Sequence, residues 1–202
     1  MIKDVALKQE AYAVMRGYVG VRELTGNNDG EQIGKAQKLM GLTIGSAKVK
    51  GDPYCAAMIV CAFTVALAKH FDVDPRNERD IKAQVLPHVG SMIPVSASVM
   101  EMHLQARERG LWRPNPRTRW ENGYTPAQGD LVCFHFRGSG NHIGMVEAIT
   151  GEEIHTIEAN TSPVRGTAES NDPRGGVFRK VWKRSDDAVW GFIRIPERVA
   201  LA

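Results

Sequence analysis

The sequence predicts an α+β fold in which N-terminal helices precede a C-terminal antiparallel sheet of about five strands. Apolar residues recur at helical spacing in the first half of the chain, and the spacing changes to two after Gly129. The 202 residues, of which 43% are hydrophobic, are enough to bury a core without metal or disulfide staples. We therefore interpret residues 1–202 as a single domain.

Two amphipathic helices are expected first. One covers residues 4–18, where apolar side chains fall on one face: Val5, Tyr12, Met15 and Val19. The other covers residues 33–40. Gly41 is placed to cap it, because glycine readily adopts the left-handed conformation that ends helices.

The third predicted helix is the most informative one. Asp52 suits the N-cap position and Pro53 the first helical position, so that Cys55 falls in the first turn. Residues 56–71 are apolar on nearly every face. This pattern predicts a buried central helix rather than a surface helix.

The middle of the chain is less regular. Residues 72–97 contain three prolines and are expected to be connecting loops around a short helical piece. Ser98-Val-Met-Glu101 is a capping-box pattern that opens a helix to about Arg109. Residues 112–124 predict an irregular, basic and aromatic loop.

Alternation of apolar and polar residues indicates the strands. They are expected over residues 130–136, 142–149, 153–160, 176–183 and 189–195. Thr150-Gly-Glu-Glu153 indicates a hairpin turn between the second and the third.

Composition excludes several classes of partner. The net charge of +3 is too small for a dedicated nucleic-acid binder, and the sequence has no glycine-rich phosphate loop. The basic residues over 165–184 are expected to form a solvated face. The N-terminus lacks the apolar core of a signal peptide, and the longest apolar stretch, residues 56–68, is too short to cross a bilayer. We expect synthesis in the cytoplasm and no membrane partner.

Cys55 is the candidate nucleophile. The unpaired N–H groups and the dipole at a helix N-terminus favour thiolate over thiol, and they also stabilise an oxyanion when the sulfur attacks an acyl carbon. The three cysteines form no C-x-x-C pair, so we expect reduced thiols. Cys61 and Cys133 are interpreted as small buried hydrophobes, which is also the alternative for Cys55.

A thiolate nucleophile needs a base, and His142 at the start of a strand is the best placed of the six histidines. His135 and His155 are mid-strand alternatives. Glu158 and Asn160 are two apart, so they share one face of a strand and are suited to orient an imidazole. Edge-strand polarity is the structural alternative for these two residues.

Four ordered segments carry a resemblance to a known family: Gly51-Asp-Pro-Tyr-Cys55-Ala-Ala, Pro126-Ala-Gln-Gly-Asp130-Leu-Val, Asn141-His-Ile-Gly-Met-Val146 and Ile157-Glu-Ala-Asn-Thr161. They are similar to segments of the CHAP (cysteine, histidine-dependent amidohydrolase/peptidase) family of cell-wall hydrolases, within the papain-like and NlpC-like group. The resemblance spans roughly residues 10–196.

The resemblance implies a papain-like arrangement in which the helix that bears the nucleophile Cys55 packs on the sheet. It also implies that His142 acts as general base and then acid, that Glu158 orients it, and that Asn160 is a fourth polar member. We expect no cofactor and no bound metal.

Substrate-binding residues are expected around this cleft. They are Tyr54, which stands where tryptophan is commoner in the family, together with Asn141, Trp112 and Trp120. Approximately residues 71–125 exceed a minimal domain. We interpret them as an insertion, with an extra helix and an aromatic, basic loop, that shapes substrate choice.

The function implied is hydrolysis of an amide bond in peptidoglycan through an acyl-enzyme. The bond is either the N-acetylmuramoyl-L-alanine linkage or one within the stem peptide or cross-bridge. The protein is expected to act on the cell wall as a monomer after release or delivery, as a phage lysin, a virion-associated hydrolase or a secreted effector. An effector would need a cognate inhibitor in its producer.

Two other classes stay open. Cys133, His135, His142 and His155 would hold zinc if adjacent strands gathered them, which would make a metal-dependent hydrolase. The aromatic residues and the basic late region would instead make a non-catalytic module that binds the wall.

A calcium site is a separate question. Asn27-Asn-Asp-Gly-Glu31 offers oxygen ligands but does not match the EF-hand spacing. We expect Glu23 and Asp29 to serve the turns of their own loop.

Overall fold

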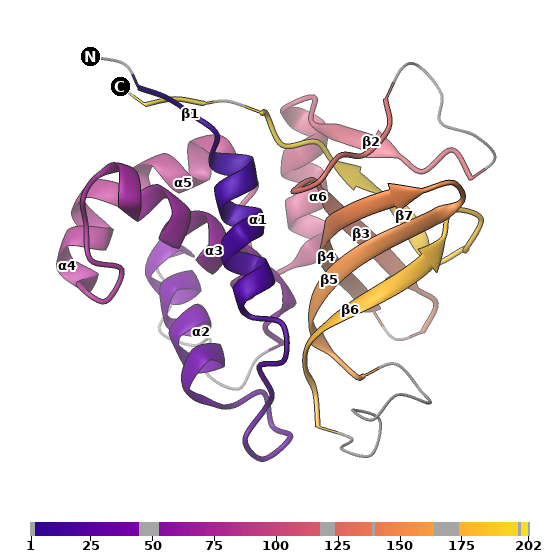
Figure 1. Cartoon of the computed structure of the whole chain (residues 1–202), viewed down its shortest axis with the longest axis horizontal. Helices are drawn as coiled ribbons and strands as arrows, with labels where there is room; N and C mark the ends of the chain where they lie inside the picture. The colour runs from indigo at the N-terminus through magenta and orange to yellow at the C-terminus, as the bar shows by residue number, and fades with distance from the viewer. Residues whose placement is uncertain are drawn as a thin grey trace.

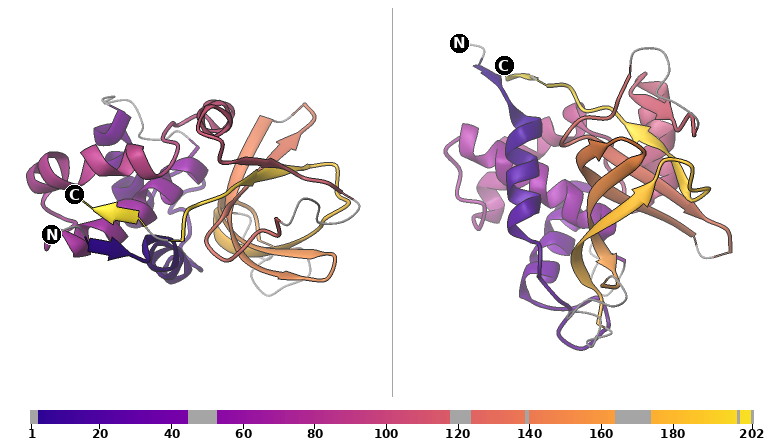
Figure 2. Two further views of the ribbon diagram at one scale, coloured as in Figure 1. Left: turned by 90° about the horizontal axis from the view of Figure 1, so that it is seen from above. Right: turned by 45° about the vertical axis from the view of Figure 1, so that its right-hand side comes forward.

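A layer of helices lies beside a curved antiparallel sheet in the computed structural model (Figure 1). The structure describes residues 3–44, 53–117, 124–138, 140–163, 174–197 and 199–201. Seen from above, the strands curl around an interior of their own on the side away from the helices (Figure 2). The predicted α+β class is therefore confirmed.

The helical layer contains seven described elements. They are α1 (Leu7–Gly17), α2 (Glu31–Ile44), α3 (Cys55–His70), α4 (Glu78–Asp80), the π-helical turn η1 (Ile81–Val85), α5 (Leu86–Met92) and α6 (Val99–Glu108). Nearly every residue of α3 is buried, as predicted for a central helix, and α3 packs against both α1 and α2. None of the helices in the described part of the chain has the length and apolarity needed to span a membrane.

Three helix predictions between residues 41 and 97 are wrong, and the first helix begins at Leu7 rather than at residue 4. Gly41 lies inside α2 and is buried. Its φ is not positive, so it does not adopt the left-handed conformation that ends a helix. Pro53 precedes α3, whose N-cap is Tyr54, and Asp52 lies outside the described residues. The region 72–97 is largely helical. Pro87 stands in the first turn of α5, where a proline begins a helix rather than ending one.

The capping box that opens α6 forms with an extra member. The Ser98 side chain accepts the Glu101 N–H at 3.4 Å, as predicted. The return bond is relayed, because the Ser98 N–H donates to the Ser96 hydroxyl at 2.9 Å and that hydroxyl donates to the Glu101 carboxylate at 2.7 Å. The helix therefore starts where the sequence places it.

The sheet has six strands in the order β2-β7-β3-β4-β5-β6, and every pair is antiparallel. The strands are β2 (Trp112–Pro114), β3 (Leu131–Phe136), β4 (Gly140–Thr150), β5 (Glu153–Thr161), β6 (Gly176–Lys183) and β7 (Val189–Ile193). The expectation of an irregular loop at Trp112 is wrong, because this segment pairs with β7 as an edge strand. Residues 118–123 of that loop lie outside the described residues.

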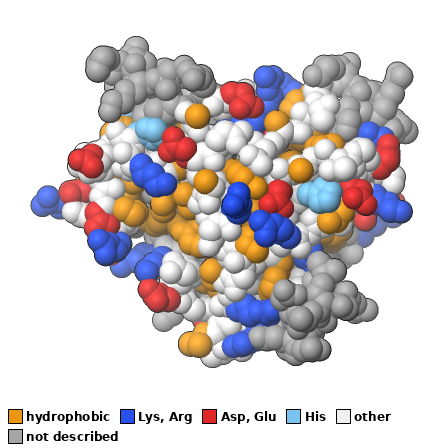
Figure 3. Space-filling view, viewed as in Figure 1, with side chains coloured by type: hydrophobic (Ala, Val, Ile, Leu, Met, Phe, Trp, Pro, Cys, Tyr) orange, Lys and Arg blue, Asp and Glu red, His pale blue; other side chains and the backbone are white. Residues whose placement is uncertain are grey.

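Two apolar clusters lie on the two sides of the sheet. Alternate residues of β3 divide between them, with Cys133 in the cluster that contains α3 and with Val132 and Phe134 in the other. On the outer surface, acidic and basic side chains are interspersed over the face in Figure 3. This distribution agrees with the small net charge.

Three basic residues of the late region have partners in the described part of the chain. Arg179 pairs with Glu147 at 2.9 Å, and Arg184 pairs with Glu152. Arg174 donates to the Leu24 carbonyl at 3.0 Å. These contacts leave no concentrated basic patch among the three arginines.

A buried ion pair joins the helical layer to the sheet. Lys8 of α1 lies 2.8 Å from Asp130, and their side chains are 2% and 1% exposed. Asp130 also accepts three further hydrogen bonds of 2.9 Å, from the Tyr124 hydroxyl and from the N–H groups of Ala127 and Ile195. One carboxylate therefore fixes α1, the start of β3 and the chain beyond β7.

Gly129 makes this ion pair geometrically feasible. Its φ is +85°, and a Cβ there would lie 2.7 Å from Lys8 Cγ and 2.9 Å from the Lys8 carbonyl oxygen. Any side chain at this position would push α1 away from the sheet.

A pair of short strands closes the chain on itself. β1 (Lys3–Val5) pairs antiparallel with β8 (Val199–Leu201), so that Lys3 lies opposite Leu201. Both strands lie beyond the first helix in Figure 1, near the labelled termini. The sequence pattern did not predict either strand.

We predict that Lys8→Ala lowers the free energy of unfolding by about 3–5 kcal/mol, because it leaves the buried Asp130 carboxylate without its cation. Urea denaturation of the two proteins measures this difference. The control is Lys35→Ala, which removes an exposed pair with Glu31 on α2 and should barely move the midpoint. Equal effects of the two substitutions would contradict the prediction.

Candidate active site

Cys55 is the first residue of α3. The first helical hydrogen bond runs from the Met58 N–H to the Tyr54 carbonyl at 2.9 Å, so the N–H groups of the first turn have no acceptor within the helix. These N–H groups and the helix dipole favour negative charge on the Cys55 sulfur. The side chain is buried, with the residue 5% exposed.

The other two cysteines have surroundings that disfavour a thiolate. Burial raises the pKa of Cys61 to about 11, although a contact with the Tyr18 hydroxyl opposes this effect. Burial likewise raises the pKa of Cys133, a fully enclosed residue of β3. Both therefore remain neutral thiols, as expected of small buried hydrophobes.

His142 and Glu158 form a buried pair across two neighbouring strands. His142 Nε2 lies 3.1 Å from Glu158 Oε2, and the two side chains are 11% and 1% exposed. In the β4–β5 register, Glu158 is opposite Gly144, which shares a face with His142. The glycine leaves room for Glu158, because a Cβ there would lie 2.7 Å from Glu158 Cγ.

The Glu158 carboxylate is held by two further donors. Its Oε1 accepts hydrogen bonds of 2.6 Å from the Thr156 hydroxyl and from Trp182 Nε1. Burial acts to raise the pKa of Glu158, but the bonds from His142, Thr156 and Trp182 outweigh it and the pKa is lowered. The buried carboxylate therefore stays ionised.

The same balance sets the charge of His142. Burial acts to lower the pKa of the imidazole, whereas the Cys55 side chain and the Glu158 carboxylate raise it to about 9. Because Nε2 faces Glu158, Nδ1 is the nitrogen left for proton exchange with the thiol. The site thus favours an imidazolium that lies between the Glu158 carboxylate and the Cys55 side chain.

A second buried carboxylate supports the start of α3. The Tyr54 hydroxyl donates to Glu23 Oε1 at 3.1 Å, and the residues are 0% and 5% exposed. The backbone N–H of Asn160 donates to the same Tyr54 oxygen, and burial together with Glu23 raises the pKa of this phenol. The contacts join the loop before α2, the N-cap of α3 and the end of β5. They set the separation between Cys55 and the strand that carries Glu158.

Asn160 has an unusual backbone conformation. Its φ is +59°, in the left-handed region that asparagine tolerates better than most residues. This conformation coincides with a register shift between β5 and β6. Its side chain is half-buried and makes no hydrogen bond with the described residues.

The expected substrate-binding residues fall in different places. Tyr54 is fully enclosed, so we assign it a positioning role rather than contact with substrate. Asn141 Oδ1 accepts a hydrogen bond from His135 Nδ1 at 2.7 Å, and Asn141 lies next to His142. Trp112 is half-buried against Trp190, and Trp120 lies outside the described residues.

Sequence reasoning missed three residues that complete the site. Thr156 and Trp182 hold Glu158, and Glu23 holds Tyr54. Thr156 lies two residues before Glu158 on the same face, which is a usable sequence signal. Trp182 and Glu23 come from distant segments and give no such signal. The expectation that Glu23 serves its own loop is therefore wrong.

Metal ligation finds no support in the part of the chain that the structure describes. No group of three or more His, Cys, Asp and Glu side chains is gathered there in a way that would hold an ion. Of the four residues considered for zinc, Cys133 is enclosed in the core, His135 contacts Asn141, His142 contacts Glu158, and His155 lies 3.5 Å from Glu153. The zinc-dependent class thus has no described site.

The loop considered for calcium is closed by its own hydrogen bonds. Asp29 accepts from the Thr25 N–H at 2.9 Å and from the Thr25 hydroxyl at 2.8 Å, and Asn27 donates to that hydroxyl oxygen at 2.9 Å. These bonds lower the pKa of Asp29. The predicted role of Asp29 in its own turn agrees with this geometry.

The CHAP domain family model matches residues 50–160, which is more than half of the chain. The crystal structure of Ly7917 is similar with a TM-score of 0.44 and 14% identity, over 93% of this chain. The match covers 62% of the Ly7917 chain, so the present chain spans less than two thirds of its length. No curated protein sequence matches the chain.

We predict that Gly144→Ala separates His142 from Glu158, because the new methyl group would overlap Glu158 Cγ. The rate of Cys55 alkylation by iodoacetamide at pH 6 should fall about tenfold or more, since the thiolate loses its imidazolium partner. Gly34→Ala on α2 meets no atom within 4 Å and is the control. An unchanged alkylation rate in a folded Gly144→Ala protein would contradict the prediction.

We predict that Glu158→Gln lowers the pKa of His142 from about 9. Burial remains in the variant, whereas the carboxylate that favours the imidazolium is lost. A raised pKa contributes stability that is fully present below the unfolded value of 6.5 and is lost as pH rises through about 9. NMR titration of the ring measures the pKa. Glu153→Gln, beside His155, should leave it unchanged.

Proposed function

The chain belongs to the CHAP domain family, and we propose that it hydrolyses an amide bond of peptidoglycan through an acyl-enzyme. Members of this family are typically cysteine- and histidine-dependent amidohydrolases that act on peptidoglycan. The observation that carries the proposal is the buried His142–Glu158 pair of 3.1 Å, with Cys55 against the same imidazole. In this proposal Cys55 is the nucleophile, His142 the base and acid, and Glu158 its orienting partner.

The first step is acylation. The Cys55 thiolate attacks the amide carbonyl carbon and forms the S–C bond, while the carbonyl oxygen gains negative charge. The Cys55 N–H, which lacks a helical acceptor, is placed to donate to that oxyanion. The C–N bond then breaks as His142 gives its proton to the leaving amine.

The second step is hydrolysis of the thioester. A water molecule gives a proton to the now neutral His142, and its oxygen attacks the acyl carbon. The S–C bond breaks, the carboxylic acid product leaves, and the thiolate and imidazolium are restored. Glu158 remains ionised throughout and keeps the ring in one orientation.

Three neighbours support this arrangement without reacting. Tyr54, held by Glu23, fixes the start of α3 and hence the direction of the first-turn N–H groups. Asn160, proposed as the fourth polar member of the site, is fixed through its backbone by the same tyrosine. Its side-chain amide, which bonds none of the described residues, is then available to a substrate group that crosses the end of β5.

We propose cleavage either at the N-acetylmuramoyl-L-alanine bond or within the stem peptide and its cross-bridge. Both bonds present an amide carbonyl to the thiolate, and the chemistry of the site serves either. The protein would then act on the cell wall, as a lysin or as a secreted effector whose producer carries an inhibitor.

Mass spectrometry of fragments released from purified peptidoglycan tests the proposal and names the bond. The wild type should release fragments with new amine and carboxyl ends, and Cys55→Ala should release none. Cys61→Ala is the matched control, since it removes a buried thiol from the same helix and should keep most of the activity. Fragments from Cys55→Ala at the wild-type rate would sink the mechanism. Wall binding without fragments from any variant would favour a non-catalytic module.

A further inference from the structure

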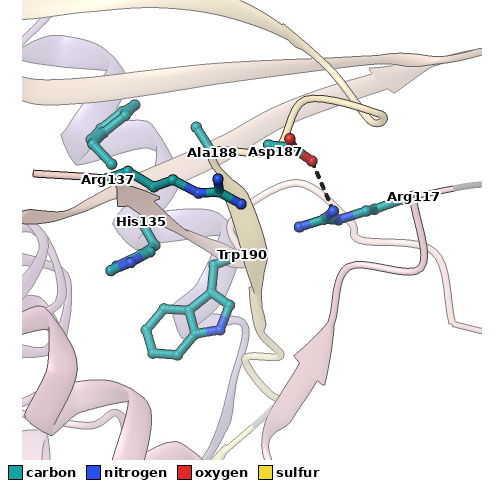
Figure 4. Close-up of a pocket in the computed structure, with 7 residues that line it drawn as sticks. Arg117, His135, Arg137, Asp187, Ala188 and Trp190 are labelled. Carbon is teal, nitrogen blue, oxygen red and sulfur yellow. Dashed lines mark hydrogen bonds and ion pairs between the residues drawn. The ribbon is translucent and has the colours of Figure 1, made fainter.

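A pocket opens at the end of the sheet that β3 and β7 share, outside the pair described above. Its volume is about 460 Å³, and it is lined by His135 and Arg137 of β3 and its turn, by Asp187, Ala188 and Trp190 around β7, and by Arg117. Figure 4 shows Arg137 and Arg117 reaching toward the space beside Trp190 from opposite sides. The lining therefore combines an aromatic wall with two guanidinium groups.

The aromatic wall is rigid because other rings pack behind it. The Trp190 ring lies 4.0 Å from the His103 ring and 5.2 Å from the Trp112 ring, measured between centroids. Trp112 approaches this closely because Gly191 has no side chain, and a Cβ there would lie 2.4 Å from Trp112 Cζ2. Burial lowers the pKa of His103, so this ring is neutral at physiological pH. The wall thus has a fixed shape and carries no charge.

The charges at the rim do not cancel. Arg117 is neutralised by Asp187, with 2.8 Å between Nη1 and Oδ1. Arg137 makes no hydrogen bond or ion pair with any residue that the structure describes. Among the described residues, the pocket therefore has one cation without an anionic partner, beside an apolar wall, which is an arrangement suited to a planar anion.

The pocket lies next to the proposed base. His135 is opposite Asn141 in the β3–β4 register, and its Nδ1 is 2.7 Å from Asn141 Oδ1. Asn141 directly precedes His142, and side chains alternate along a strand. The pocket and His142 therefore lie at the same end of β4 on opposite faces of the strand, and a substrate would reach both by passing around the start of that strand.

We propose that this pocket is a subsite for a free carboxylate of the peptidoglycan stem peptide, with Arg137 as its ligand and Trp190 as the wall against which the neighbouring apolar atoms pack. The inference rests on the proposed function and adds the chemical group that the substrate presents beside the scissile amide. A guanidinium binds a carboxylate through two parallel N–H bonds, whereas a carboxamide at the same position accepts only one and brings N–H groups that face a cation. The pocket therefore distinguishes the acid from its amide.

Two soluble disaccharide-peptide fragments that differ only in a free carboxylate or a carboxamide on one stem residue test this subsite. For the wild type, KM for the carboxylate fragment should be about fivefold to tenfold lower, with similar kcat. Arg137→Gln should remove this difference by raising KM for the carboxylate fragment. The control is Arg79→Gln, which changes an exposed arginine paired with Asp80 on the helical layer and should leave both KM values unchanged.

Binding to Cys55→Ala separates this inference from the proposed function. If the wild type cuts neither fragment, the proposed function fails, and calorimetric titration of Cys55→Ala with the two fragments still decides the subsite. Tighter binding of the carboxylate fragment that is lost in Cys55→Ala/Arg137→Gln supports it. Equal binding of acid and amide, or an equal loss for both when Arg137 is replaced, overturns it in favour of contacts with the glycan or the peptide backbone.

Discussion

The buried ion pair between Lys8 and Asp130 is the constraint on which the relation between the two layers depends. The thiol belongs to the helical layer and the imidazole to the sheet, so their contact exists only while the layers keep one relative position. Asp130 accepts four donors from separate segments, which fully compensates a carboxylate that is 1% exposed. The segment from Pro126 to Asp130 therefore helps to position the site from a distance. Gly129 leaves room for α1, and Asp130 holds that helix through Lys8.

Two further buried carboxylates in the site are likewise held by hydrogen-bond donors. Glu158 is ionised because His142, Thr156 and Trp182 occupy its two oxygens, and Glu23 is held against Tyr54 at the start of α3. Each carboxylate fixes a different part of the site. Glu158 fixes the ring orientation of His142, and Glu23 fixes the position of the helix start. Catalytic charges can be kept in a dry interior only where such donors are supplied from several strands.

The sequence pattern was sufficient where local rules dominate. The alternation of β4 and β5 places His142, Gly144 and Glu158 on one face, and the hairpin between these strands makes them neighbours. Contacts between distant segments were not predictable, as with Glu23 and Tyr54, which are 31 positions apart. Gly41 shows how tertiary packing overrides a local signal, since it stands inside a helix that a glycine would usually end. Pro87 instead follows a local preference, because it stands in the first turn of a helix. The family resemblance indicated the roles of Cys55, His142 and Glu158, whereas only the structure shows which residues hold them in place.

The pairing of β1 with β8 brings the two ends of the chain to one corner of the molecule, beside α1 (Figure 1). A peptide linker of a few residues would therefore join Lys3 to Leu201 without crossing either layer. New ends could then be opened at the β4–β5 hairpin, where Gly151 and Glu152 are exposed. Such a circular permutant would keep the order of the sheet but separate His142 and Glu158 to opposite ends of the chain. Their pairing would then depend on tertiary structure alone and no longer on a two-residue turn.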